Sequence, residues 1–185
     1  MTILPRKFYS KNTVTVAKNL LGKRIIRKIE RNEISGIITE TEAYGYNDDP
    51  ASHAFRKITE RNKIMFGEVG FAYVYFTYGM HFCFNVVAKN PKKAAGAVLI
   101  RAIEPEKGIK VMQKNRGIQN LKNLTNGTAK LAQALDITKE HYGVDLTKES
   151  KLYITEGIKS KKIITSQRIG ITKAVDKMWN FKIKI

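Results

Sequence analysis

Residues Phe71–Val87 read FAYVYFTYGMHFCFNVV, the densest aromatic stretch of the chain. Two runs of β-forming residues flank Tyr78-Gly79-Met80-His81, and the glycine in this short connection is typical of a hairpin turn. Strands joined by so short a turn pair antiparallel. The stretch therefore predicts a β-hairpin with Tyr78 at or near its tip.

Several segments on either side of this hairpin also favour strands. Residues 23–30 have a strand-like pattern, and Glu33–Tyr44 carries apolar and β-branched residues in the arrangement of a second strand. Ala97–Ala102 (AVLIRA) reads as a buried strand interrupted by Arg101. In the tail, the pieces KLYI and KKIITSQRIGI and the closing KMWNFKIKI are strand-like as well.

Helical patterns are shorter and fewer. Thr13–Leu21 predicts a helix capped by Thr13 or Thr15 and ended by Gly22, residues 104–116 predict a basic helix, and Thr128–Leu135 predicts another. Strands and helices do not alternate regularly. We therefore expect an α+β fold in one domain, 1–185: a curved, mainly antiparallel β-sheet flanked by helices, with a protruding hairpin.

Composition narrows the class of partner. The chain has 185 residues, 43% of them hydrophobic, and its 34 Lys+Arg against 16 Asp+Glu give a net charge of +18. Such an excess of positive charge attracts polyanions: nucleic acid is the first candidate partner and an anionic membrane surface the second. The alternative is a general bias toward basic composition, which would imply no particular partner.

Cysteine content and targeting patterns narrow the location. The one cysteine, Cys83, excludes an internal disulfide and a multi-cysteine zinc site, and its neighbours Phe82 and Phe84 favour a buried thiol. No apolar run has the length of a membrane span, and the N-terminus MTILPRKFYS lacks the apolar core of a secretory signal. We expect an intracellular protein.

The acidic residues gather in Glu40–His53 (ETEAYGYNDDPASH), which holds four of the 16 carboxylates. A solvated loop, a metal site and a catalytic carboxylate are the three interpretations. Strand alternation puts Glu40, Glu42 and Tyr44 on one face, so a carboxylate beside an aromatic wall is available as a general base. Metal binding is the least favoured, because the spacing matches no EF-hand or paired-histidine motif.

The aromatic hairpin offers a second candidate surface. Tyr73 and Tyr75 share one strand face. Aromatic residues in strands ordinarily pack in the core, and the functional alternative is that these two stack on a base drawn out of the duplex. Tyr78 at the tip of a hairpin in a basic protein fits a side chain inserted between base pairs. Asn85 and Arg101 interrupt apolar strands, so each is either satisfied by a neighbour or directed at a ligand.

These residues occur in an order that resembles the alkyladenine (3-methyladenine) DNA glycosylase family. The resemblance runs from about Leu20 to the Trp179–Phe181 region, and its most specific motifs are ETEAY and YGM with their spacing. The other matching pieces are His53, Arg61-Asn62, Met65-Phe66, Tyr73-Val74-Tyr75, Phe82-Cys83 with Asn85, LIRAIEP at 99–105, Lys130-Leu131 and Gln133-Ala134-Leu135.

The resemblance implies a role for each of the matching residues. Glu42 matches the general base that activates the water attacking C1′ of deoxyribose. Arg101 matches an arginine that holds this water and the carboxylate. The backbone at Ile169 matches a further contact to the water. Tyr44, His53 and Tyr75 match residues that sandwich the flipped base. Tyr78 matches the intercalating tyrosine, and Asn85 an asparagine that disfavours guanine.

The expected activity is that of a monofunctional glycosylase in base excision repair. It would act as a monomer on double-stranded DNA that contains alkylated or deaminated purines, without metal or organic cofactor and without a membrane, and would leave an abasic site. The alternatives are a non-catalytic DNA-binding protein, or a metal-dependent nuclease that uses Glu40, Glu42, Asp48 and Asp49.

Two positions depart from the family pattern. His81 follows Met80 where a tyrosine is common, and Lys63-Ile64 replaces a basic–glycine pair after Arg61-Asn62. Both bear on DNA contacts. Asp48, Asp49 and Glu40 have no catalytic role in this interpretation: the aspartates are expected in a solvated loop, and Glu40 as structural support.

Overall fold

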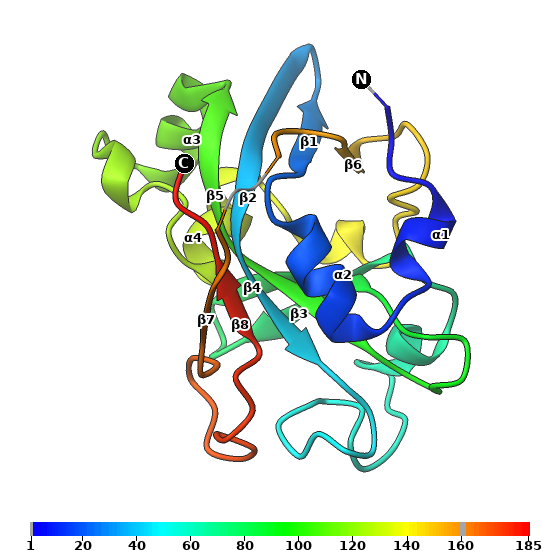
Figure 1. Ribbon diagram of the computed structural model, residues 1–185. Coiled ribbons are helices and arrows are strands. Elements are labelled where there is room, and N and C mark those ends of the chain that lie inside the picture. Colours follow the sequence, from blue (N-terminus) through cyan, green and yellow to red (C-terminus); the bar gives the residue numbers. More distant parts are fainter. Residues whose placement is uncertain (1, 160–161) are drawn as a thin grey trace.

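One curved antiparallel sheet runs through the centre of the molecule, which the computed structural model describes over residues 2–159 and 162–185 (Figure 1). Within these residues eight strands pair: β1 Arg24–Ile29, β2 Asn32–Tyr44, β3 Ala72–Thr77, β4 His81–Val87, β5 Ala97–Lys107, β6 Leu152–Thr155, β7 Ile164–Ser166 and β8 Asn180–Lys182. The main path runs β3-β4-β5-β2-β1-β6, while β8 pairs with β2 and β7.

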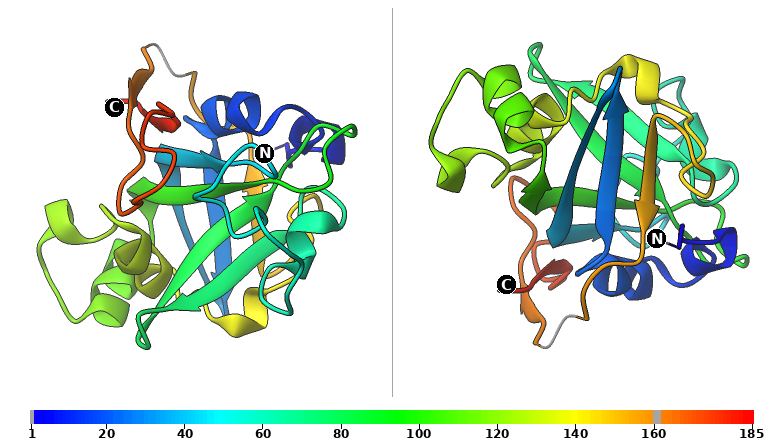
Figure 2. Two further views of the ribbon diagram at one scale, coloured as in Figure 1. Left: turned by 90° about the horizontal axis from the view of Figure 1, so that it is seen from below. Right: turned by 90° about the horizontal axis from the view of Figure 1, so that it is seen from above.

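Helices cover the sheet at two places. The α-helices are α1 Arg6–Tyr9, α2 Thr13–Leu20, α3 Ile109–Arg116 and α4 Thr128–Ala134, and the short 3-10 helices are η1 Lys63–Phe66, η2 Leu121–Asn123 and η3 Lys139–His141. Helices α1 and α2 lie on the opposite side of the molecule from α3 and α4 (Figure 2). The predicted α+β class, with a curved and mainly antiparallel sheet, is confirmed.

Helix α2 shows how a local signal and packing combine. Its cap is Asn12, whose side-chain oxygen accepts the backbone N–H of Val14, so the prediction of Thr13 or Thr15 as the cap is wrong. The hydroxyl of Thr13 instead donates to the carbonyl oxygen of Ala88. The apolar face of α2 is buried against β2 and β5, which places a helix behind the strand that carries Glu42.

Strand β5 is longer than its sequence indicates. We expected a helix from residue 104 to 116, but β5 continues to Lys107 and α3 begins only at Ile109. Pairing with β2 continues through this region, with Glu104 opposite Ile37. The backbone hydrogen bonds that β2 offers outweigh the weak helical preference of 104–107, and Gly108, at φ 72°, turns the chain into the helix.

The predicted hairpin is present as β3 and β4, with a three-residue connection. Tyr78 and Gly79 both have positive φ, at 51° and 67°. The Tyr78 side chain is 86% exposed at this tip. The short turn keeps the strand pairing in register, with Thr77 opposite His81.

A row of directly paired residues crosses five strands of the sheet. Asn180 on β8 pairs with Glu42 on β2, Glu42 with Leu99 on β5, Leu99 with Asn85 on β4, and Asn85 with Tyr73 on β3. Paired residues in adjacent strands project to the same face. Strand register therefore brings segments more than 100 residues apart onto one side of the sheet.

No helix in the described ranges has both the length and the apolar character needed to cross a membrane.

Candidate active site

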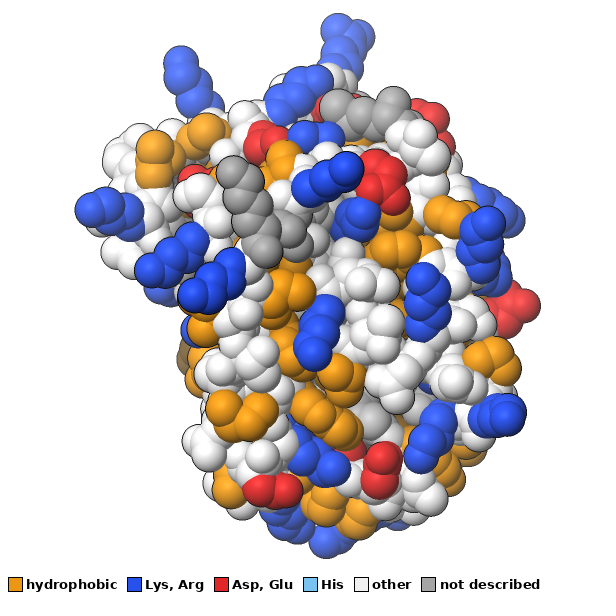
Figure 3. Space-filling view, in the orientation of Figure 1, with side chains coloured by type: hydrophobic (Ala, Val, Ile, Leu, Met, Phe, Trp, Pro, Cys, Tyr) orange, Lys and Arg blue, Asp and Glu red, His pale blue; other side chains and the backbone are white. Residues whose placement is uncertain are grey.

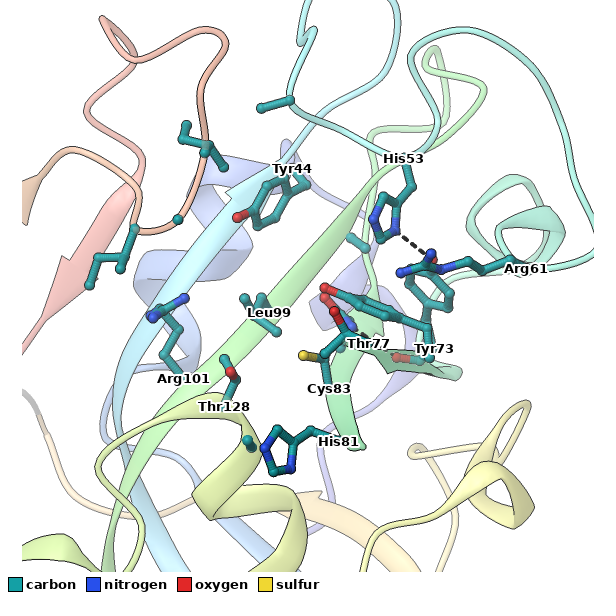
Figure 4. A pocket seen from close by; sticks show the side chains of 18 of the residues that line it. Tyr44, His53, Arg61, Tyr73, Thr77, His81, Cys83, Leu99, Arg101 and Thr128 are labelled. Carbon is teal, nitrogen blue, oxygen red and sulfur yellow. Dashed lines mark hydrogen bonds between the residues drawn. The ribbon is translucent and has the colours of Figure 1, made fainter. Parts of the chain in front are cut away.

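A pocket of about 390 Å³ opens over this row of residues (Figure 4). Strands β2, β3, β4 and β5, the loop after β2, the start of α4 and the loop after β7 all contribute to its wall. The lining includes six of the residues predicted from sequence, namely Tyr44, His53, Tyr75, Tyr78, Asn85 and Arg101, together with Ile169. The structure thus brings seven of the eight into one cavity wall.

Glu42 lies directly behind this wall. Its Oε1 accepts the backbone N–H of Ile169 at 2.8 Å and Nδ2 of Asn180 at 3.0 Å, while its Oε2 accepts the hydroxyl of Tyr44 at 2.8 Å and the guanidinium of Arg101 at 3.4 Å. The side chain is fully buried. Four donors hold one carboxylate, and three of them belong to residues that line the pocket.

Arg101 reaches the carboxylates because the strand pairing is irregular at this point. Thr41 pairs with Ile100 and Glu40 with Ala102, so Arg101 is left without a partner on β2. A bulge of this kind redirects a side chain. The guanidinium lies 3.5 Å from Oε1 of Glu40 and 3.4 Å from Oε2 of Glu42, which satisfies the arginine and also places it in the pocket.

The opposite wall is aromatic. His53 and Tyr75 meet edge to face with ring centroids 4.7 Å apart, and Nδ1 of His53 lies 2.8 Å from the hydroxyl of Tyr73. Tyr73 is fully buried, whereas the imidazole is reachable from the pocket mouth. The guanidinium of Arg61 stands over the Tyr75 ring at 4.5 Å. A flat ligand that enters the pocket would meet ring faces and edges on this side.

The polar groups of this wall are held uncharged. Desolvation in the pocket, with a smaller contribution from the charge of Arg61, lowers the pKa of His53 to about 4. Burial likewise raises the pKa values of the Tyr73 and Tyr75 hydroxyls and of the Cys83 thiol above their ordinary values. Near neutral pH these groups are therefore neutral donors and acceptors, and the thiol is no nucleophile.

Asn85 resolves an alternative that the sequence left open. It is 3% exposed, its Nδ2 donates to the carbonyl oxygen of Tyr73 at 3.0 Å, and the residue still lines the pocket. It is therefore both satisfied by a neighbour and placed at the ligand space.

Comparison with known proteins shows the family of the chain. A sequence profile of the methylpurine-DNA glycosylase family matches residues 7–185. The chain belongs to this family. The chain is similar to proteins from three organisms. The one from Carboxydothermus hydrogenoformans is 47% identical over 98% of this chain and 95% of its own length, and the one from Prosthecochloris aestuarii is 46% identical over 94% of this chain and 84% of its own length. The one from Francisella tularensis subsp. tularensis is 46% identical over 93% of this chain and 90% of its own length. Each bears a name that marks it as a candidate 3-methyladenine DNA glycosylase.

Family membership confirms the expected enzyme class, a hydrolytic DNA glycosylase of DNA repair, and with it DNA as the substrate. The roles of the individual residues stay predictions.

Sequence reasoning missed one direct partner of Glu42. Asn180 stands opposite it on β8, and its Nδ2 donates to both Glu42 and Glu40, the latter at 2.8 Å. Its Oδ1 accepts the hydroxyl of Ser166 at 3.1 Å. An asparagine in WNFKIKI has no local signal that would point to a glutamate 138 residues earlier.

The expectation for Asp49 is wrong. Instead of lying in a solvated loop, its side chain is fully buried and makes two 2.7 Å contacts with the guanidinium of Arg168. Asp48 does stay at the surface, 3.8 Å from Lys93. Tertiary contacts thus give two adjacent aspartates opposite environments.

The same pairing bears on the nuclease alternative. With Asp49 bound to Arg168 and Asp48 facing Lys93, these carboxylates do not converge on Glu42. Across the part of the chain that the structure describes, no group of three or more His, Cys, Asp or Glu side chains could hold a metal ion.

The loop that departs from the family pattern is ordered by local bonds. Lys63 and Ile64 open η1, and Lys63 forms a surface ion pair with Glu60 at 2.7 Å. Asn62 is buried, and its Nδ2 donates to the carbonyl oxygens of His53 and Lys57. This asparagine fixes the backbone from which His53 projects.

Proposed function

We propose that this chain is a monofunctional DNA glycosylase that draws an alkylated or deaminated purine out of duplex DNA and hydrolyses its N-glycosidic bond. A water molecule attacks C1′ of the deoxyribose and gives a proton to Glu42. A cationic alkylated purine leaves as the neutral base, a deaminated purine leaves after it is protonated from solvent, and an abasic site remains. The whole chain, 1–185, acts as one glycosylase domain and as a monomer. No metal or organic cofactor enters the reaction.

The observation that carries the proposal is the hydrogen-bonded position of Glu42 at the pocket wall. Cleavage of the glycosidic bond develops positive charge on the sugar, and a nearby carboxylate stabilises that charge and accepts the proton of the attacking water. The 3.4 Å contact between Arg101 and Oε2 is the longest of the four. The water would bind beside this oxygen, with Arg101 as its second contact.

The aromatic wall supports recognition of a flipped purine. Tyr44 on one side, with His53 and Tyr75 on the other, offers π-faces to the base. Purines alkylated at N3 or N7 carry positive charge, which electron-rich rings favour. Asn85, which lines the pocket, would disfavour an undamaged guanine by crowding its exocyclic amino group.

Tyr78 supports the proposed intercalation. It is the most exposed large hydrophobic residue that lines the pocket, at 86%, at the tip of the paired strands β3 and β4. A ring in this position can enter the base stack and fill the space that the nucleotide leaves.

The surface charge supports binding to the DNA backbone. Lys and Arg side chains are spread over the face seen in Figure 3, with fewer acidic ones between them. The net charge of +18 gives sequence-independent and salt-sensitive attraction to phosphates.

A product assay tests the proposal. Duplex oligonucleotides, each with one 3-methyladenine, 7-methylguanine, hypoxanthine or ethenoadenine, are incubated with excess enzyme, with and without EDTA, and abasic sites are revealed by alkaline cleavage. We expect abasic sites on at least one duplex, and equal rates with EDTA. DNA binding without abasic sites would support the non-catalytic alternative, and strand scission abolished by EDTA would support the nuclease.

A further inference from the structure

A buried ion pair lies behind the pocket and touches both of its functional halves. Asp49 belongs to the loop after β2, which continues to His53, and Arg168 belongs to the loop after β7, which continues to Ile169. Both side chains are fully buried. Neither residue lines the pocket.

On its Asp49 side the pair fixes the end of β2. Oδ2 of Asp49 accepts the backbone N–H of Gly45 at 2.8 Å, and a guanidinium nitrogen of Arg168 donates to the carbonyl oxygen of Ala43 at 3.0 Å. These two bonds bracket Tyr44. The guanidinium also stands over the Tyr44 ring at 4.7 Å. Tyr44 lines the cavity and Arg168 does not, so the arginine contacts this ring without being part of the pocket lining.

On its Arg168 side the pair fixes the next residue of the chain. The backbone N–H of Ile169 donates to Oε1 of Glu42 at 2.8 Å, and Ile169 itself lines the pocket. The orientation of this N–H depends on the backbone of Arg168. Arg168 therefore contacts the Tyr44 ring through its guanidinium and directly precedes the residue whose N–H donates to Glu42.

The buried ion pair between Asp49 and Arg168 is not well explained by a contribution to folding stability alone. Burying two charges costs free energy that their attraction recovers only with well-satisfied hydrogen bonds. Nε of Arg168 is buried without a hydrogen-bond partner among the residues that the structure describes, which adds a desolvation cost. What the pair provides is a fixed geometry: the two-pronged contact between a planar guanidinium and a carboxylate sets both orientation and distance.

We propose that Asp49 and Arg168 are positioning residues for base excision, which couple the aromatic wall to the carboxylate that activates water. The inference rests on the function proposed above. If the pair is loosened, Tyr44 and the Ile169 N–H move independently, and bound substrate is no longer aligned with Glu42. A displacement of about 1 Å at a reacting centre can reduce a rate about 100-fold.

The test uses Arg168→Lys, which keeps the charge but loses the two-pronged contact, and Asp49→Asn, which keeps the shape but loses the charge. Arg27→Lys is the matched control. Arg27 is another buried arginine, 8% exposed, which faces Asp136 at 3.7 Å and does not line the pocket. Single-turnover excision, affinity for lesion DNA and thermal unfolding are measured for all three, on the best substrate of the product assay.

We expect Arg168→Lys to lower the single-turnover rate about 100-fold, and Asp49→Asn to lower it less. Affinity for lesion DNA should stay within about threefold of wild type in both, because the phosphate contacts are unchanged. Arg27→Lys should excise at the wild-type rate even if its melting temperature falls as far as that of Arg168→Lys.

A spectroscopic readout tests the geometry without activity. Trp179 is the chain's one tryptophan, and the Arg168 guanidinium lies 5.3 Å from its ring. Arg168→Lys should therefore change the tryptophan emission of the folded protein, whereas Arg27→Lys should not.

Three results would overturn the inference. In the first, wild type is active and both folded variants at the pair excise at its rate. In the second, Arg27→Lys lowers the rate as much as Arg168→Lys. In the third, the rate loss is matched by an equal loss of DNA affinity. A wild type that excises no lesion would instead contradict the proposed function, and the inference with it.

Discussion

Tyr44 donates its hydroxyl hydrogen bond to Oε2 of Glu42 at 2.8 Å, although the two residues are only two positions apart in β2. Strand alternation puts both side chains on one face, and burial of the phenol raises its pKa above the ordinary value, with the charge of Glu42 a smaller cause. The residue proposed to stack on the base is thus also a ligand of the proposed general base. This relationship makes the roles of ring and hydroxyl separable by mutation.

Tyr44→Phe should keep the ring and lose the bond to Glu42. We expect the single-turnover excision rate to fall about tenfold, the effect of one hydrogen bond to a charged group, with affinity for lesion DNA unchanged. Tyr46→Phe, a tyrosine outside the pocket lining, is the control. Loss of affinity in Tyr44→Phe would show that the hydroxyl, and not the ring alone, binds DNA.

Glu42→Gln should abolish most excision while lesion DNA is still bound, because an amide cannot accept the proton of the attacking water. Loss of general-base catalysis predicts a fall of about 100- to 10,000-fold in the single-turnover rate. Glu40→Gln is the matched control on the same strand, since Glu40 contacts Arg101 and Asn180 but is expected to be structural. An unchanged rate in Glu42→Gln would sink the general-base assignment.

Tyr78→Ala should weaken binding to lesion DNA by about 5- to 150-fold, the range of one lost aromatic stacking contact. Stability should not change, because the side chain is exposed. A fluorescent-base assay would report flipping directly, with Leu121→Ala as a control for the loss of an exposed apolar side chain outside the pocket. Normal base flipping by Tyr78→Ala would contradict the proposed intercalation of Tyr78.

Asn85→Ser should relax selectivity against guanine. The smaller side chain removes the expected clash with the exocyclic amino group, and we expect the rate on guanine-like bases to rise about tenfold relative to hypoxanthine. The same change removes the bond to the Tyr73 carbonyl, so thermal unfolding is measured in parallel. If the ratio of the two excision rates is unchanged in a folded variant, Asn85 does not set the selectivity against guanine.

His141 is one of two histidines, with His53, through which the stability of the fold should depend on pH. Its Nδ1 accepts the backbone N–H of Thr138, the residue is 2% exposed, and burial together with the charges of Arg27 and Lys151 lowers its pKa to about 4. The unfolded chain binds the proton near pH 6.5, so it holds more protons than the folded chain between the two values. The stability that neutral His141 contributes is complete above about pH 6.5 and is lost as pH falls toward 4.

Denaturant unfolding at a series of pH values measures this effect. One proton contributes a slope of at most about 1.4 kcal/mol per pH unit in this window, and His141→Gln should reduce the slope by up to that amount. His81→Gln, which replaces a histidine at the pocket, serves as the control. Equal slopes in wild type and His141→Gln would show that the histidine does not carry the dependence.

The parts of the fold that the sequence predicts are those set by neighbours in the chain. The hairpin, α4 and the shared face of Glu42 and Tyr44 follow from glycine placement and periodicity over a few residues. The extension of β5 to Lys107 does not, because it depends on the length of β2 beside it. The cap of α2 at Asn12 could be predicted from the sequence, because asparagine is at least as favourable an N-cap as threonine.

The site divides in the same way. The sequence by itself determined the chemical groups, their order and their family, because ETEAY, YGM and LIRAIEP are contiguous motifs. Only the tertiary structure decided which carboxylate is surrounded by donors and which is bound to an arginine. Glu42 meets Asn180, and Asp49 meets Arg168, across more than 110 residues of chain. Such contacts depend on strand register and loop packing, and local sequence carries no record of either.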